Sequence, residues 1–243
     1  MAHDFSDKVV LVTGASRGFG WASAHAFAAA GGQVVAVART QGALEELDDA
    51  IRAAGGPAAV LVPLDITDDA GLARLGAAVH ERFGRVDLWL HTAFLAPPLA
   101  PVAHIAEKDL DRCVATGLKA YQRMIRAIDP LLRQAPEPTA LIAADDPQSR
   151  PFHGLYGAVK AAQAALTEAW RVEAAGKVAV TALRLPAMPT ALRGRFYPGE
   201  DRDGLARPAE VAGRLLDALA TEQPRGILDL GRARVTGPEH RSH

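Results

Sequence analysis

A tyrosine and a lysine lie four positions apart in the segment GLYGAVKAA, as Tyr156 and Lys160. On a helix this spacing places both side chains on one face. An ammonium group beside a phenol favours the phenolate, so Lys160 is expected to lower the pKa of Tyr156 from its ordinary value of about 10. A tyrosine tuned in this way can exchange a proton with the oxygen of an alcohol or a carbonyl compound. The alternative is an incidental pair on an exposed helix face.

A glycine-rich loop near the amino terminus is a second candidate site. Gly14, Gly18 and Gly20 lie in TGASRGFGWASAHAFAAAGG, between an apolar run and an alanine-rich stretch with helical spacing. Glycines allow a sharp turn and a close approach of the backbone to a pyrophosphate, and the free amides of a helix N-terminus favour anions. The strand, loop and helix context indicates a dinucleotide site. A tight turn without a ligand is the alternative.

Arg17 and Arg39 bear on which dinucleotide is bound. Arg39 follows the second apolar run, where a fold specific for NAD usually has an acidic residue that binds the ribose hydroxyls. Guanidinium groups suit the geometry of a 2′-phosphate. The two arginines together favour NADP(H) over NAD(H), whereas each alone also fits a solvated surface charge.

The elements that position these residues alternate between strand-type and helix-type patterns. Apolar runs cover 8–13, 33–38, 58–63, 86–91, 139–144, 178–185 and, more weakly, 226–230. Several runs are apolar at consecutive positions, as expected for parallel strands covered on both faces. This predicts one α/β domain over 1–243, a Rossmann-type doubly wound parallel sheet of about seven strands flanked by helices. The irregular connection around 186–207 is predicted to be a substrate lid, because ligands of such folds lie beyond the carboxyl ends of the strands.

Composition excludes several classes of function. A formal net charge of −1 gives no global basic field for nucleic acid or anionic lipid. No apolar run is long enough to span a membrane and the amino terminus has no apolar signal core, so a cytoplasmic protein is expected. With Cys113 as the one cysteine, neither an intrachain disulfide nor a thiolate metal site can form. Cys113 is interpreted as a packing residue, and no metal is predicted.

With these motifs in order, the sequence resembles the short-chain dehydrogenase/reductase superfamily over essentially the whole chain. The family's glycine loop, its adenine-contacting acid after the third strand, its Tyr-x-x-x-Lys pair and its Pro-Gly with a nearby Thr all have counterparts, except that Ala187 replaces the last glycine. The resemblance implies that the cofactor is contacted by Thr13, Gly14, Ser16, Arg17, Gly18, Gly20, Arg39, Asp65, Ala93, Tyr156, Lys160, Pro186 and Thr190.

The resemblance also implies that Tyr156 is the acid or base and that Lys160 supports it and holds the nicotinamide ribose. Two of the family's four catalytic residues are missing: its serine aligns with Ala143, and its asparagine with Gly117. The family's Asn-Asn-Ala-Gly turn reads His-Thr-Ala-Phe at 91–94. One well-placed donor to a developing oxyanion is worth about 3 to 4 kcal/mol. The missing serine would therefore slow carbonyl reduction without forbidding it.

Polar residues near these positions are candidate replacements. Asp145, Asp146 and Ser149 lie between the fifth strand and Tyr156, and His91 ends the fourth strand. Asp145 is the first choice, because a protonated carboxyl in an apolar site can donate a hydrogen bond. The alternatives are a solvated loop acid for Asp145 and a packed, hydrogen-bonded residue for His91.

The leading hypothesis is an NADP(H)-dependent oxidoreductase acting on an unknown carbonyl or alcohol substrate. Its alternatives are a redox-silent NADP-binding protein that serves as a sensor or partner subunit, and a non-redox isomerase or lyase. The lid residues Arg193, Arg195 and Tyr197 face either substrate or solvent. A homodimer or homotetramer is expected from the resemblance, through helices over 104–134 and 152–175 that are rich in alanine and leucine.

Overall fold

A single parallel sheet of seven strands, in the order β3-β2-β1-β4-β5-β6-β7, forms the centre of the molecule. The computed structural model describes residues 4–145, 150–221 and 223–231. Its strands are β1 (Val9–Thr13), β2 (Gln33–Ala38), β3 (Val60–Pro63), β4 (Leu88–His91), β5 (Thr139–Ala144), β6 (Ala179–Arg184) and β7 (Gly226–Asp229). Each predicted run contains one of these strands. The predicted α/β class and doubly wound topology are confirmed.

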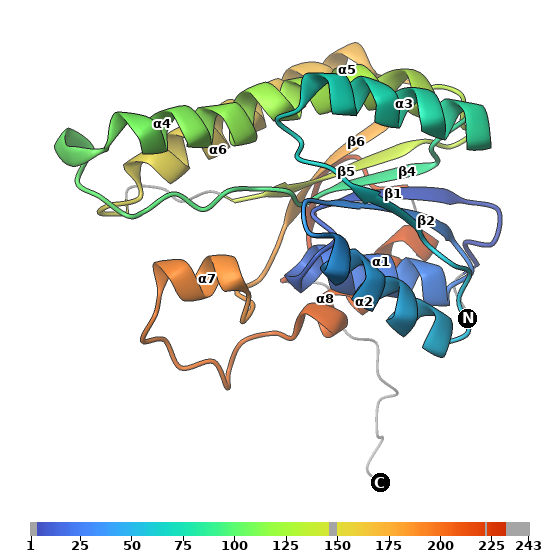
Figure 1. Cartoon of the computed structure of the whole chain (residues 1–243), viewed down its shortest axis with the longest axis horizontal. Coiled ribbons are helices and arrows are strands. Elements are labelled where there is room, and N and C mark those ends of the chain that lie inside the picture. Colours follow the sequence, from blue (N-terminus) through green and yellow to red (C-terminus); the bar gives the residue numbers. More distant parts are fainter. Residues whose placement is uncertain (1–3, 146–149, 222, 232–243) are drawn as a thin grey trace, which may run out of the picture.

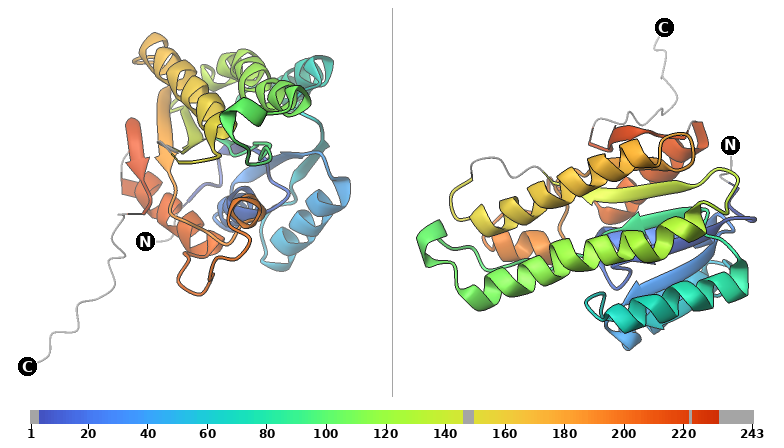
Figure 2. Two further views of the ribbon diagram at one scale, coloured as in Figure 1. Left: turned by 90° about the vertical axis from the view of Figure 1, so that its left-hand side faces the viewer. Right: turned by 90° about the horizontal axis from the view of Figure 1, so that it is seen from above.

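Helices cover both faces of the sheet (Figure 1). One layer consists of α1 (Gly18–Ala29), α2 (Gln41–Ala53) and α8 (Pro208–Thr221). The other consists of α3 (Asp69–Phe83), α4 (Glu107–Val114), α5 (Ala120–Leu132) and α6 (Gly154–Glu173), and Figure 2 shows α3, α5 and α6 side by side over the strands. Two short elements, the 3-10 turn η1 (Val102–His104) and α7 (Ala191–Phe196), lie outside these layers.

The consecutive apolar residues of the strands supply two separate cores. In β1, Val10 and Val12 pack with the layer that contains α1 and α8, whereas Val9 and Leu11 pack with the layer that contains α5 and α6. Successive side chains of a strand point to opposite faces, so a strand between two helical layers must be apolar at every position. This is why the sequence pattern predicted parallel strands.

The strand order reverses between β1 and β4, and this reversal places the glycine loop. Strand β1 pairs with β2 on one side and with β4 on the other. The connections that follow β1 and β4 therefore diverge at the carboxyl ends of these strands, which is where open α/β sheets bind ligands. The predicted connection 186–207 contains α7 and extends beyond the same ends (Figure 1).

A π-helical turn, η2 (Ala115–Lys119), joins α4 to α5 without a break in the helix. Turns of this kind are rare and often lie at functional sites. Gly117, the position aligned with the family's asparagine, is buried within it. Over the described residues, no helix combines the length and the apolar character needed to cross a membrane.

Candidate active site

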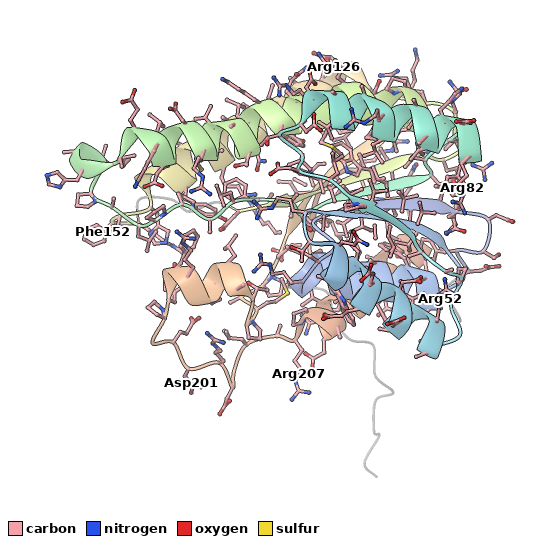
Figure 3. All side chains as sticks on the ribbon, in the orientation of Figure 1. Arg52, Arg82, Arg126, Phe152, Asp201 and Arg207 are labelled. Carbon is pink, nitrogen blue, oxygen red and sulfur yellow. The ribbon has the colours of Figure 1, made fainter. Side chains whose placement is uncertain are left out.

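Helix α6 carries Tyr156 and Lys160, and an unusual turn precedes it. Phe152 has a backbone φ of 67°, and among the described residues it is the only one other than glycine with a positive φ. Its carbonyl accepts a hydrogen bond from the Ala100 amide at 3.2 Å. Figure 3 shows Phe152 near α4, at the end of the molecule where the strands stop. A left-handed bulky residue is strained, so the surrounding contacts hold this turn in place.

Tyr156 lies between two aromatic rings. Its ring is 3% exposed and meets Phe94 edge-on at 5.3 Å and Phe196 at 4.9 Å between ring centres. Its hydroxyl donates a hydrogen bond to Oδ2 of Asp145 at 2.7 Å. The phenol is thus enclosed by apolar walls, and its one polar atom faces a carboxylate.

This environment keeps Tyr156 protonated. Burial raises the pKa of Tyr156, and the charge and hydrogen bond of Asp145 raise it further. The expectation that Lys160 lowers this pKa is wrong for this structure, because burial and a neighbouring anion both stabilise the neutral phenol. Tyr156 is therefore a neutral phenol in this environment.

Lys160 is buried beneath the same site. Its Nζ donates to the carbonyl oxygen of Ala143 at 3.0 Å and lies 4.5 Å from the centre of the Phe94 ring. Burial lowers the pKa of Lys160 to about 8, and the charge of Asp145 opposes this effect. The cation is thus held by a backbone carbonyl and an aromatic face.

Asp145, the first candidate for a replacement donor, accepts a hydrogen bond from Tyr156 instead, and its exposure agrees with the alternative of a solvated loop acid. It is exposed, whereas the donor interpretation needs an apolar site around a protonated carboxyl. The other candidates in this connection, Asp146 and Ser149, lie outside the described residues. Asp145 also lines a groove of about 690 Å³ that runs along α6 towards β7.

His91 is packed and neutral, as its alternative interpretation held. It is 2% exposed, Nδ1 lies 2.8 Å from Oγ1 of Thr13, and its ring stacks on Tyr121 at 5.1 Å. Burial, with a smaller effect from the charge of Lys160, lowers the pKa of His91 to about 3. Cys113 packs against Val159, and burial raises the pKa of its thiol to about 11, which agrees with a packing role.

The glycine loop has the shape of an anion cradle. Gly14 has a φ of 90°, and a Cβ on Gly20 would lie 2.3 Å from the Gly14 carbonyl oxygen, so only glycine fits at either position. Helix α1 starts next to this loop without a side-chain cap from Arg17 and without an acidic residue in its first turn. Its first amides are therefore available to an anion, and the loop fits a dinucleotide pyrophosphate.

The remaining predicted cofactor positions lie around this loop at the carboxyl ends of the strands. A Cβ on Gly18 would lie 3.2 Å from Cγ2 of Thr190, so the connection after β6 meets the loop. Asp65 follows β3 and accepts hydrogen bonds from the amide and hydroxyl of Thr67 at 2.9 and 2.7 Å. Partial burial raises the pKa of Asp65, but the two hydrogen bonds from Thr67 and the charge of nearby Arg39 outweigh it, so the pKa is lowered overall. The other predicted positions there are Thr13, Ser16, Arg17, Ala93 and Pro186.

Comparison with known proteins decides the family. The sequence model described as short chain dehydrogenase matches residues 8–201. The chain belongs to the short-chain dehydrogenase family. It is 36% identical to galactitol 2-dehydrogenase of Agrobacterium fabrum over 127 residues, which is 51% of this chain and 46%, about half, of that relative's length.

Two longer matches extend over most of the chain. A short chain dehydrogenase of Monascus purpureus is 32% identical over 230 residues, covering 89% of this chain and 76% of its own. A short chain dehydrogenase of Shigella flexneri 2a, solved in complex with NADP, has the same fold with a TM-score of 0.90. It is 22% identical and covers 95% of this chain and 100% of its own.

The space beside Gly117, where the family's asparagine was expected from the resemblance, is occupied by neighbouring side chains. A Cβ on Gly117 would lie 2.3 Å from Cγ1 of Val159 and 2.8 Å from Cε2 of Phe94. No larger side chain fits while these two residues keep their places. Gly117 is thus enclosed by side chains, and the Phe94 ring contacts both Tyr156 and Lys160.

Sequence reasoning missed Phe94, Phe196 and Arg150 near Tyr156 in this short-chain dehydrogenase, and it left open whether Arg193 and Tyr197 face substrate or solvent. Nη1 of Arg150 donates to the Tyr197 hydroxyl at 2.7 Å, and the Arg193 guanidinium lies 4.7 Å from the Tyr197 ring centre. Arg193 also pairs with Glu200. Arg193 and Tyr197 therefore make internal contacts that join the connection after β6 to the turn before α6. The altered turn at 91–94 was the one available signal, since it contains Phe94.

Proposed function

We propose that this protein is an NADP(H)-dependent oxidoreductase that reduces a carbonyl compound, with Tyr156 as the acid. One observation carries the proposal: α7 links the two parts of the site. Thr190, at its start, lies against Gly18, and Phe196, at its end, packs on the Tyr156 ring. A helix of six residues spans about 9 Å, so the glycine loop and the phenol lie within one small region.

The residues would share the reaction as follows. Bound NADPH supplies the hydride. Tyr156 gives its proton to the carbonyl oxygen, which its raised pKa permits because an alkoxide is a stronger base than the phenolate. Lys160 is buried and holds a positive charge beside the site, where its Nζ is bound to the Ala143 carbonyl. The raised pKa of Tyr156 favours reduction over reactions that need a phenolate base, including isomerase or lyase chemistry.

The preference for NADP(H) rests on Arg17 and Arg39. Both side chains are exposed. Arg17 lies in the glycine loop, and Arg39 follows β2 with Asp65 as a nearby acid. Guanidinium groups bind phosphate with charge-assisted hydrogen bonds. The Shigella flexneri structure in complex with NADP supports the same preference.

Binding and turnover test this function. NADPH is expected to bind in a calorimetric titration more tightly than NADH, and to be oxidised with some member of a panel of aldehydes, ketones and imines. Tyr156→Phe is expected to abolish turnover and keep NADPH binding. Tyr121→Phe is the matched control, because its buried hydroxyl bonds Thr167 away from the site. Equal turnover in Tyr156→Phe and the wild type would rule out the proposed acid.

A redox-silent NADP-binding protein is the second candidate. It is favoured by the missing donors at Ala143 and Ala144 and by the filled space at Gly117. NADPH binding without hydride transfer to any compound of the panel would select this candidate. Failure to bind either nicotinamide dinucleotide would reject both.

We also propose a homodimer or homotetramer. The exposed positions of α6 include Ala158, Ala161, Ala165 and Val172, which suit close packing against another helix. Sedimentation at micromolar concentration is expected to show a dimer or tetramer, and a monomer alone would contradict this assembly.

A further inference from the structure

The hydrogen bond between Tyr156 and Asp145 connects the buried phenol to the surface. The phenol hydroxyl donates to Oδ2 at 2.7 Å, and Asp145 is exposed. Within the described part of the chain, Asp145 is the one side chain that hydrogen bonds this hydroxyl. A proton that leaves or reaches Tyr156 through this hydrogen bond passes to or from Asp145, which is in contact with solvent.

Among the described residues, the groups around Lys160 offer no comparable route. Lys160 is 7% exposed, its Nζ is bound to the Ala143 carbonyl, and the Phe94 ring covers it. Beyond Lys160, Val159 and Phe94 occupy the space at Gly117. A side chain that could hold a proton-conducting water there has no room. Proton exchange at Tyr156 must therefore take another path.

We propose that Asp145 is a proton-relay residue that joins the Tyr156 hydroxyl to solvent. This inference rests on the proposed function, since it assigns the source of the proton that the carbonyl oxygen receives. Asp145 acts through Tyr156 and needs no contact with the substrate.

The relay balances in both directions. In reduction, the carbonyl carbon gains the hydride, its oxygen gains the Tyr156 proton, and the phenolate regains a proton that Asp145 takes from water. In oxidation, the alcohol proton moves to the Tyr156 oxygen while the phenolic proton moves to Oδ2 of Asp145. Overall, a carbonyl compound, NADPH and one proton become an alcohol and NADP⁺.

Electrostatics favour the return of the proton. A phenolate beside the Asp145 carboxylate would place two anions within hydrogen-bonding distance, which burial makes more costly. The phenolate therefore does not accumulate. The other charged or titratable groups around the pair are Lys160, Cys113, Arg150, His153, Arg193 and Tyr197.

The Asp145→Asn variant separates proton transfer by Asp145 from its positioning of the Tyr156 hydroxyl. The amide oxygen can still accept the Tyr156 hydrogen bond, but it cannot carry a proton at neutral pH. We expect turnover with NADPH to fall by about 100-fold, the lower end of what a positioned proton-transfer group contributes, and NADPH binding to be unchanged. Asp145→Glu is expected to restore part of the loss. Glu168→Gln, which changes an exposed carboxylate on α6 away from the site, is the control.

Chemical rescue of turnover by small carboxylates distinguishes a proton-relay role of Asp145 from a purely structural role. Formate or acetate is expected to restore turnover in Asp145→Ala with a dependence on buffer concentration, and to do nothing in Tyr156→Phe. Without cofactor, the exchange of the Tyr156 hydroxyl hydrogen with water is expected to slow in Asp145→Asn, as measured by NMR of tyrosine labelled at Cζ in mixed H₂O and D₂O.

The outcomes distinguish the relay from the proposed function. If the wild type turns over and Asp145→Asn is equally fast, or if carboxylates do not rescue Asp145→Ala, the relay is wrong. The proposed oxidoreductase function is not affected by either result. A wild-type protein that binds NADPH without turnover overturns both. Unchanged hydroxyl exchange in Asp145→Asn also contradicts the relay.

Discussion

The Nζ atom of Lys160 lies 4.5 Å from the centre of the Phe94 ring, so the cation beneath the site faces an aromatic surface. The same ring meets Tyr156 edge-on and borders Gly117. Phe94 thus contacts both members of the Tyr-x-x-x-Lys pair and, with Val159, fills the space at Gly117.

The buried cation of Lys160 makes stability depend on pH in the alkaline range. Its pKa is lowered from 10.5 to about 8, so the unfolded chain binds more protons between these values, and stability rises with pH there. From pH 7 to 10 the free energy of unfolding should rise by about 2.5 kcal/mol relative to Lys160→Met. Urea unfolding of both proteins at several pH values measures this. Parallel curves would contradict the burial of the charge.

His91 makes a prediction of the same sign in the acid range. Its pKa is lowered from 6.5 to about 3, so the unfolded chain binds more protons between these values and the native state loses stability as pH falls. From pH 7 to 4.5 the wild type should lose about 2.5 kcal/mol more than His91→Phe. Denaturant unfolding at each pH gives this difference. An equal loss in both proteins would show that His91 is free to charge in the native state.

Gly20→Ala should open the glycine loop. The new Cβ would lie 2.3 Å from the Gly14 carbonyl oxygen and 2.5 Å from Oγ1 of Thr92. We expect a loss of about 1 to 3 kcal/mol in stability and no measurable NADPH binding. Gly213→Ala is the matched control, because it lies in α8 with no atom within 4 Å of the new Cβ, and it should stabilise the protein slightly. Calorimetry and thermal unfolding compare the two.

Gly117→Ala tests how tightly position 117 is enclosed. Its Cβ would overlap Val159 and Phe94, so a loss of about 1 to 3 kcal/mol is expected. Adding Val159→Ala should recover part of this loss, because it removes the atom that lies 2.3 Å away. A double-mutant cycle measured by urea unfolding gives the coupling. Additive effects would show that the two positions do not compete for space.

Arg39→Ala addresses the cofactor. Removing one charge-assisted contact to a 2′-phosphate should weaken NADPH binding by roughly 10- to 100-fold, from about 1.5 to 3 kcal/mol, and leave NADH unaffected. Arg52→Ala, an exposed arginine paired with Asp48 in α2, is the control. Equal losses for both dinucleotides would remove the basis for preferring NADP(H).

The sheet could be predicted because its central strands β1, β2 and β4 are buried on both faces, and this burial leaves unbroken apolar runs such as 33–38 in the sequence. The positions of Tyr156, Lys160 and the glycine loop followed from local spacing. The pKa of Tyr156 could not, because it depends on Phe94, Phe196 and the exposed carboxylate of Asp145, which come from separate connections. Helical spacing places two side chains on one face, but it does not determine the direction in which Lys160 extends.

The π turn at 115–119 lies between α4 and α5 in one continuous helix, and the two segments contact different parts of the protein. Before it, Cys113 faces Leu155 and Val159 beside the site, and after it, Met124 and Ile128 face the sheet. A π turn contains one residue more than an α turn, so loss of a single residue within it would return the turn to α geometry. A one-residue deletion in this turn would therefore change the wall of the site locally, while the segments on either side keep the faces that they present to the site and to the sheet.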